Sequence, residues 1–282
     1  MKDNVVTLYI YLPYEYFEKD IENNYLKLTM ADYTNDPCEF LVAPCNLEKM
    51  KDVIEMQNKA ARTKWGCLCF SKNGKNSAMW GNYADKHYGV CLEFEFEYFD
   101  KFNPKRESNV YSYIVDKIKN AHFDKNHPDQ SFVREIAYSG VRSHYPDTDE
   151  EMVNEFDRFK KDLINSKREQ LEDKEVINFW INDIWQDSIY TKNESWKYEE
   201  EVRMMFFLGG ADLDNIIGYD PEKCDCGNIF VKGVNKYIKR VVLGVRCESN
   251  EEDVRKFLES NNRCDVSVVR AKYDDRCHEI KF

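Results

Sequence analysis

The sequence has no long apolar run and no nucleotide-binding loop. No stretch approaches the ~18 consecutive apolar residues that a membrane-spanning helix needs, and acidic residues flank the short apolar run near the N-terminus, unlike a secretory signal. Neither a GxGxxG pattern nor a P-loop occurs. The sequence therefore predicts a cytoplasmic protein without membrane contact, and it does not support a Rossmann dehydrogenase or a P-loop hydrolase.

A net positive charge and metal-binding motifs are also absent from the sequence. The 41 Lys and Arg residues face 52 Asp and Glu, a net charge of −11, which repels a phosphate backbone and disfavours general nucleic-acid binding. The five histidines form no HxH or HExxH pattern, and the pairs Cys67-x-Cys69 and Cys224-x-Cys226 lack zinc spacing. We expect no bound metal, and we expect the ten scattered cysteines to be free thiols.

What is present is enough apolar sequence for a globular core. Hydrophobic residues make up 42% of the 282 residues, and aromatic residues 14%. Short β-rich runs give way at about 147–190 to a charged pattern of helical period. This predicts a single α+β domain over residues 1–282, with mixed or antiparallel sheets that form a cleft, and a helical insertion at 147–190.

The expected elements follow from period and turn residues. Strands are predicted at Val5–Leu12, Tyr25–Thr29, Gly66–Ser71, Gly89–Phe96, Asn109–Val115, Glu201–Leu208, Ile238–Val245, Asp265–Tyr273 and Cys277–Phe282. Further helices are predicted at Leu47–Arg62, Ser77–His87 and Asn250–Ser260.

The helix expected at Ser77–His87 lies between two apolar strands and carries polar groups. One stripe of this helix is formed by Trp80, Tyr83, Ala84 and His87. A stripe that faces the core is the ordinary interpretation. The polar, glycine-containing loop before it favours a site, because it follows Ser71 at a strand end, and Ser77 could cap a helix whose free N–H groups hold a phosphate.

Two other segments place polar or charged residues beside apolar sequence. Asn35 and Asp36 precede a proline, and a plain turn is their ordinary interpretation. Glu199, Glu201 and Arg203 alternate where an apolar strand is expected to start, so they should share one face. Charges are usually exposed, but charges that enter a buried strand need partners, and two carboxylates with an arginine can form a site cluster.

Together these segments resemble a widespread bacterial family of unknown function. The likeness is carried by LTMADYTNDPCEF, by the CFS strand, by the block MW-x-x-YAD-x-H-x-GVC-x-E-F and by W-x-YE-x-E-x-R, and it covers nearly the whole chain. Some relatives are labelled AbiGi-like abortive-infection proteins of phage resistance. The resemblance implies a role in bacterial defence or as a toxin. This sequence departs from the family pattern at Ile10, where relatives often carry a basic residue.

The order of these motifs is also similar to that of ADP-ribosyltransferase-like folds, which bind NAD with a residue on a first strand, a Tyr or Ser after it and a late Glu. Tyr9 or Tyr11 occupies the first of these places. The catalytic residues implied by the likeness are Glu201, Tyr83 and His87. The nucleotide-binding residues implied are Ser71, Trp80, Asn35, Asp36, Glu199 and Arg203. NAD would be a substrate, with no tightly bound cofactor and with a protein as a possible target or partner.

Two other functions stay open. The same cleft could belong to a non-catalytic sensor that binds a nucleotide or a phage component and signals to a partner. Alternatively, Asp36, Glu199 and Glu201 could hold a divalent metal in a hydrolase, which the acidic charge fits although a nucleic-acid substrate does not. An enzyme is favoured if Tyr83, His87 and Glu201 line one pocket.

Overall fold

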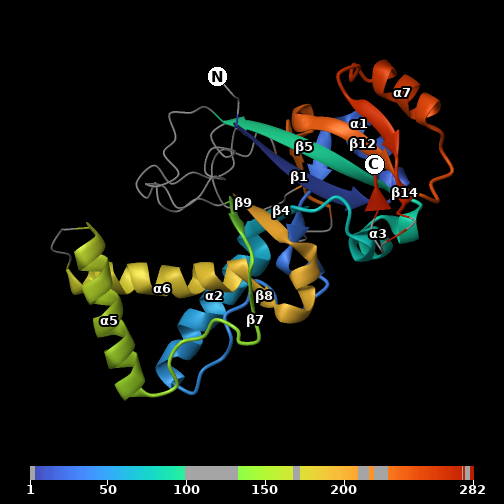
Figure 1. Cartoon of the computed structure of the whole chain (residues 1–282). Helices are drawn as coiled ribbons and strands as arrows, with labels where there is room; N and C mark the ends of the chain where they lie inside the picture. Colours follow the sequence, from blue (N-terminus) through green and yellow to red (C-terminus); the bar gives the residue numbers. More distant parts are fainter. Residues whose placement is uncertain are drawn as a thin grey trace. The chain divides into compact units, whose positions relative to one another are not determined.

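The protein is α+β with mixed sheets, as the sequence predicts (Figure 1). The computed structural model describes residues 4–98, 133–167, 172–208, 216–218, 228–274, 276 and 280–282. The chain divides into two compact units. Unit 1 contains Met1–Thr29, Gly66–Glu135 and Lys197–Phe282, and unit 2 contains Met30–Trp65 and Ile136–Trp196. The single domain stays a prediction, and the strand predicted at Asn109–Val115 lies outside the described residues.

Unit 1 is built on a long sheet with the strand order β13-β12-β5-β1-β4-β9-β6. These strands are β1 (Asn4–Leu12), β4 (Trp65–Ser71), β5 (Val90–Tyr98), β6 (Val133–Glu135), β9 (Glu201–Phe207), β12 (Ile238–Leu243) and β13 (Ser267–Arg270). The central strands β1 and β5 are antiparallel along their whole length, side by side in Figure 1. Side chains alternate between the two faces of these strands, and Leu8, Leu92 and Phe94 are buried on the apolar face.

One edge of the sheet is parallel and needs a helical crossover. Strands β12 and β13 pair in parallel, and α7 (Glu251–Ser260) connects them and packs on β13. Asn250 caps α7 by accepting the backbone N–H of Asp253 at 2.9 Å, and Val254 and Leu258, one turn apart, are buried. The predicted helix at Asn250–Ser260 is confirmed.

Smaller elements complete unit 1. They are α1 (Tyr14–Asn23), β2 (Tyr25–Lys27), α3 (Ser77–Tyr83), β10 (Ile216–Ile217), β11 (Phe230–Lys232), β14 (Lys272–Tyr273) and β15 (Ile280–Lys281). Strands β10, β11 and β2 form one small sheet, and β14 and β15 form another. The strand β3 (Thr29–Met30) lies where the chain passes from unit 1 to unit 2.

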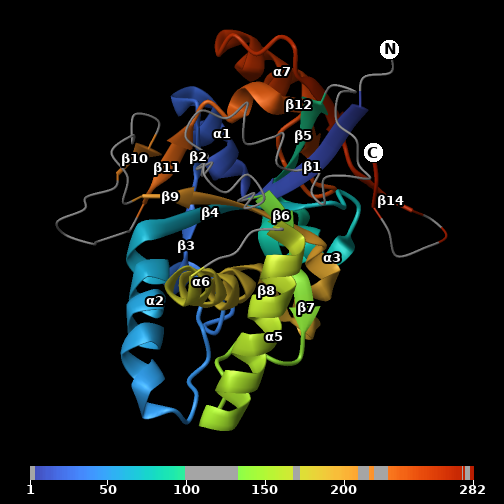
Figure 2. The same cartoon turned by 90° about the vertical axis from the view of Figure 1, so that its left-hand side faces the viewer.

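Unit 2 is mainly helical (Figure 2). Its elements are α2 (Lys51–Lys64), β7 (Ala137–Ser139), α5 (Asp149–Lys167), α6 (Asp173–Tyr190) and β8 (Thr191–Asn193), and β7 pairs with β8 in parallel. The core of these helices includes Ile54, Met152 and Trp180. The helical character predicted at 147–190 is confirmed by α5 and α6. No helix within the described ranges is long and apolar enough to cross a membrane.

Two glycines of unit 1 give a matched test of the packing. A Cβ at Gly244 would lie 2.0 Å from the backbone oxygen of His87, whereas a Cβ at Gly81, in α3, would meet nothing within 4 Å. We expect Gly244→Ala to destabilise the protein by about 2–3 kcal/mol, because backbone atoms must move. Gly81→Ala should stabilise it by about 0.5–1 kcal/mol. Urea unfolding of both variants measures the difference, and equal stabilities would contradict it.

Candidate functional site

The N-terminal end of α3 differs from the prediction. The residue that caps this helix is Asn76, not Ser77, because the Oδ1 atom of Asn76 accepts the backbone N–H groups of Ala78 at 2.9 Å and Met79 at 3.4 Å. The Nδ2 group of Asn76 also donates to the backbone oxygen of Tyr198 at 2.7 Å. The two capped N–H groups therefore have a protein partner, and the helix is too short to form a phosphate site by its terminus alone.

The C-terminal end of α3 also differs. The helix ends at Tyr83 instead of His87, because Asp85, Lys86 and His87 take positive φ values of 45°, 52° and 74°. This left-handed turn is held from outside, since the backbone oxygen of His87 accepts the N–H of Arg246 at 3.0 Å. The turn removes His87 from the helical stripe that the sequence predicts.

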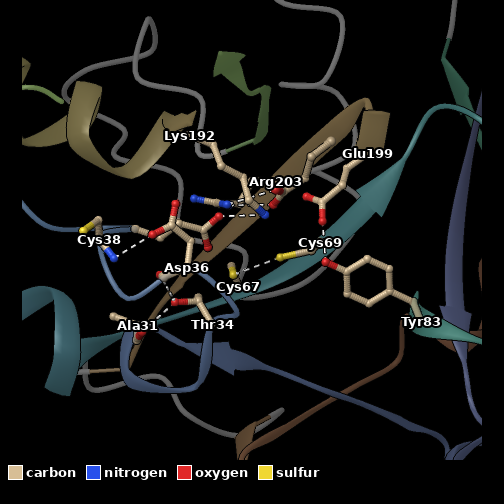
Figure 3. Close-up of polar contacts among 12 residues, drawn as sticks. Ala31, Thr34, Asp36, Cys38, Cys67, Cys69, Tyr83, Lys192, Glu199 and Arg203 are labelled. Atoms are coloured by element: carbon tan, nitrogen blue, oxygen red, sulfur yellow. Dashed lines mark hydrogen bonds and ion pairs between the residues drawn. The ribbon is translucent and has the colours of Figure 1, made fainter. Parts of the chain in front are cut away.

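Tyr83, Glu199 and Ser71 form a polar cluster in which Glu199 and Ser71 are buried and Tyr83 is partly buried. The Tyr83 hydroxyl donates to Oε1 of Glu199, whose residue surface is only 3% exposed (Figure 3). The buried Ser71 hydroxyl donates to the backbone oxygen of the same Glu199 at 2.7 Å. The strand end of β4 and the last turn of α3 therefore meet at Glu199.

Glu199 does not lie on β9, contrary to the predicted alternation. It ends a 3-10 turn, η4 (Glu194–Glu199), and Glu200 then takes a left-handed φ of 46° before the strand starts at Glu201. Glu201 and Arg203 do share one face, as predicted. Their side chains form a two-point ion pair, Nε to Oε1 at 2.8 Å and Nη2 to Oε2 at 3.0 Å, with exposures of 4% and 0%.

Hydrogen bonds tie the segment 71–83 to the segment 198–200 along its length. The Lys72 N–H donates to the Glu200 backbone oxygen at 3.0 Å, and Asn73 Nδ2 donates to Glu200 Oε1 at 2.9 Å. Asn82 Nδ2 donates to the Tyr198 hydroxyl at 3.1 Å. With the bonds of Ser71, Asn76 and Tyr83, these contacts hold the candidate site together across more than a hundred residues of sequence.

A row of polar residues crosses the sheet beside this cluster. Tyr9 on β1 lies opposite Ser71 on β4 and opposite Glu93 on β5, and Glu93 lies opposite Arg240 on β12. Arg240 Nη1 is 3.6 Å from Glu93 Oε2. Burial raises the pKa of Glu93, and burial together with Glu93 raises the pKa of Tyr9 to about 12.

Sequence reasoning missed Glu93 and Arg240. The sequence does contain a sign of Glu93, because its carboxylate stands inside the apolar segment CLEF of a predicted strand, and a charge on a buried strand needs a partner. Of the two tyrosines on the first strand, only Tyr9 belongs to this row of polar residues. Tyr9 is opposite Ser71, whereas the Tyr11 hydroxyl donates to the backbone oxygen of Asn73 at 2.6 Å.

Trp80 and His87 pack against each other. Trp80 is fully buried, and its Nε1 group donates to the backbone oxygen of Gly74 at 3.0 Å. The His87 ring is stacked on Trp80 at a centroid distance of 6.3 Å and lies 6.0 Å from the Tyr273 ring. Burial, and secondarily Arg246, lowers the pKa of His87. A pocket shared by Tyr83, His87 and Glu201 stays a prediction.

Asn35 and Asp36 belong to unit 2. Asp36 accepts the Cys38 N–H through Oδ1 at 2.9 Å, and the Thr34 hydroxyl donates to the Asp36 backbone oxygen at 2.8 Å, which is the turn that the sequence indicates (Figure 3). Both predicted residues line a pocket formed by unit 2 itself. Their assignment to an NAD site stays a prediction.

The described residues contain no group of three or more His, Cys, Asp or Glu side chains arranged to hold a metal ion. They therefore add no support to the metal-dependent alternative. Cys224 and Cys226 lie outside the described residues. The cysteines that the structure does describe are free thiols, as expected.

The two segments joined by the hydrogen bond between Tyr83 and Glu199 both lie within the part of the chain that matches a protein-family model. Residues 79–204 match the model of a family described as a protein of unknown function, DUF2971. This part of the chain matches a family of unknown function. The DUF2971 match runs from α3 into β9 and includes Tyr83, His87, Glu199, Glu201 and Arg203. No curated protein and no solved structure matched the chain.

Proposed function

We propose that unit 1 carries a nucleotide site of ADP-ribosyltransferase type, and that the protein acts in the cytoplasm as an NAD-dependent transferase or NAD glycohydrolase of bacterial defence or toxin type. One observation carries the proposal. Tyr9, Ser71 and Glu201 come from three adjacent strands, β1, β4 and β9, and Tyr9 is in register with Ser71. The Lys72 to Glu200 backbone bond brings the start of β9 to the end of β4.

The proposed chemistry needs a carboxylate at a developing cation. The bond between ribose C1′ and the nicotinamide nitrogen breaks, and its electron pair leaves with nicotinamide. Glu201 would stabilise the cationic ribose and accept a hydrogen bond from its 2′-hydroxyl, and Arg203 would fix the direction of that carboxylate. Water or a side chain of a protein target then adds to C1′ and releases a proton.

The remaining residues would position the nucleotide. Tyr83 offers an aromatic ring for nicotinamide, and its hydroxyl is held by Glu199. Ser71 would hold the loop that carries Glu199. Trp80 has no exposed surface, so it would support the site from within the core, together with the His87 ring stacked on it.

A non-catalytic nucleotide sensor in phage defence is the second candidate. It is favoured by one feature of the cluster, since both carboxylate oxygens of Glu201 already receive hydrogen bonds from Arg203. A carboxylate held in this way can fix the shape of a binding site without taking part in a reaction.

Incubation of the full chain with NAD separates the two candidates. Nicotinamide release is followed by chromatography, alone and with bacterial extract as a source of transfer targets, and NAD binding is measured by calorimetry. We expect release above the rate of uncatalysed hydrolysis. Binding without release in any extract would replace the enzyme by the sensor, and neither binding nor release would remove both.

A further inference from the structure

Unit 2 contains a pocket of about 370 Å³ that the proposed reaction does not require. Its walls come from residues 35–41, 139–143 and 188–196, all of them within unit 2. The parallel pairing of β7 with β8 ties two of these walls together. The volume lies within the usual range for small-molecule sites.

The pocket is built around a buried ion pair. Lys192 Nζ lies 2.7 Å from Glu39 Oε1, with side-chain exposures of 6% and 3%, and 4.8 Å from the centre of the Trp196 ring. Removing two charges from water is unfavourable unless their geometry is held. A fixed pair of this kind beside an aromatic ring forms a preorganised wall.

The charges that line the pocket cancel. Asp36 and Glu39 are balanced by Arg142 and Lys192, and Lys192 forms an ion pair with Glu39. Arg142 is held at the rim, since its Nη2 group donates to the backbone oxygen of Leu41 at 3.1 Å. A ligand with a net charge would leave one sign unbalanced, so the pocket favours a neutral molecule.

The lining combines apolar walls with groups that recognise hydroxyls. Pro37, Leu41, Val141 and Trp196 supply apolar surface that suits a flat ring. Asp36 uses Oδ1 for the Cys38 N–H, which leaves Oδ2 to accept a hydroxyl of a ligand (Figure 3). We propose that this pocket binds a neutral nucleoside, with its base against the apolar walls and its sugar hydroxyls toward Asp36.

Calorimetry of the full chain with adenosine, guanosine, cytidine and uridine tests the proposal. At least one should bind with a Kd below about 1 mM. AMP should bind more weakly than adenosine, because its phosphate adds a net negative charge to a pocket whose own charges cancel. No binding by any of the four nucleosides at millimolar concentration, or AMP binding more tightly than adenosine, would overturn the proposal.

Matched variants locate the binding. Asp36→Asn keeps the oxygen that accepts the Cys38 N–H but loses the charge, so nucleoside binding should weaken about tenfold. Asp32→Asn, an exposed residue of the preceding 3-10 turn that does not line the pocket, should bind like wild type. Equal affinities of the two variants would refute the site.

A second variant, Trp196→Leu, tests the pocket independently if Asp36→Asn does not fold. It should lose binding while its circular dichroism stays that of wild type, and retained binding would refute the site. Nicotinamide release is measured separately, so a failure of the pocket proposal is distinct from a failure of the proposed reaction.

Discussion

Glu201→Gln is expected to lower nicotinamide release from NAD by about 100-fold or more while the protein stays folded. The glutamine keeps the shape of the side chain and one oxygen for the Arg203 guanidinium, but it removes the negative charge that would face the ribose cation. Loss of electrostatic stabilisation at a developing charge is worth about 3 kcal/mol or more, which corresponds to that factor in rate. Steady-state chromatography of nicotinamide measures the effect.

The neighbouring glutamate provides the control. Glu200→Gln keeps an oxygen that can accept the Asn73 amide, and it should leave the rate within about twofold of wild type, since Glu200 has no proposed contact with the ribose. Full activity of Glu201→Gln would refute its catalytic role. Unfolding of Glu201→Gln, with Glu200→Gln folded, would show that Glu201 serves to neutralise the buried Arg203.

Asp20→Asn is expected to stabilise the protein by about 2–4 kcal/mol at pH 8 and to have little effect at pH 4. Asp20 is buried in α1, and burial raises its pKa from 3.8 to about 7. Between these values the folded chain holds a proton that the unfolded chain has released. The stability of the wild type therefore falls as the pH rises from about 4 to about 7, and the asparagine removes this penalty.

Urea unfolding at a series of pH values measures the difference. Glu22→Gln, an exposed carboxylate on the same helix, is the control and should show no gain that depends on pH. If Asp20→Asn and wild type keep a constant stability difference from pH 4 to pH 8, the carboxyl group is not buried as the structure has it.

The main strands could be predicted from the sequence because their apolar patterns are local. The runs that became β1 and β5 carry large apolar residues on one face, and the run that became β9 continues as an unbroken apolar stretch after Arg203. The limits of all three were found to within a few residues. The early end of α3 could not be predicted in this way. It depends on the contact of the His87 backbone oxygen with Gly244 and Arg246, which are far away in sequence.

The candidate site shows the same division. The pairing of Glu201 with Arg203 follows from strand alternation and was predictable. The turn of Glu199 toward Tyr83 was not, because one left-handed residue, Glu200, breaks the alternation. Likewise, Glu93 could be joined to Tyr9 only once the register of β1 and β5 was known.

The hydrogen bonds between segments 71–83 and 198–200 can form only late in the synthesis of the chain. Synthesis runs from the N-terminus, so α3 leaves the ribosome long before Tyr198 and Glu199 exist. Closing a loop of this length is also slow compared with forming local structure. A nascent chain therefore has no Tyr83–Glu199 contact until most of it has been translated, and any activity harmful to the cell that makes it would begin only then.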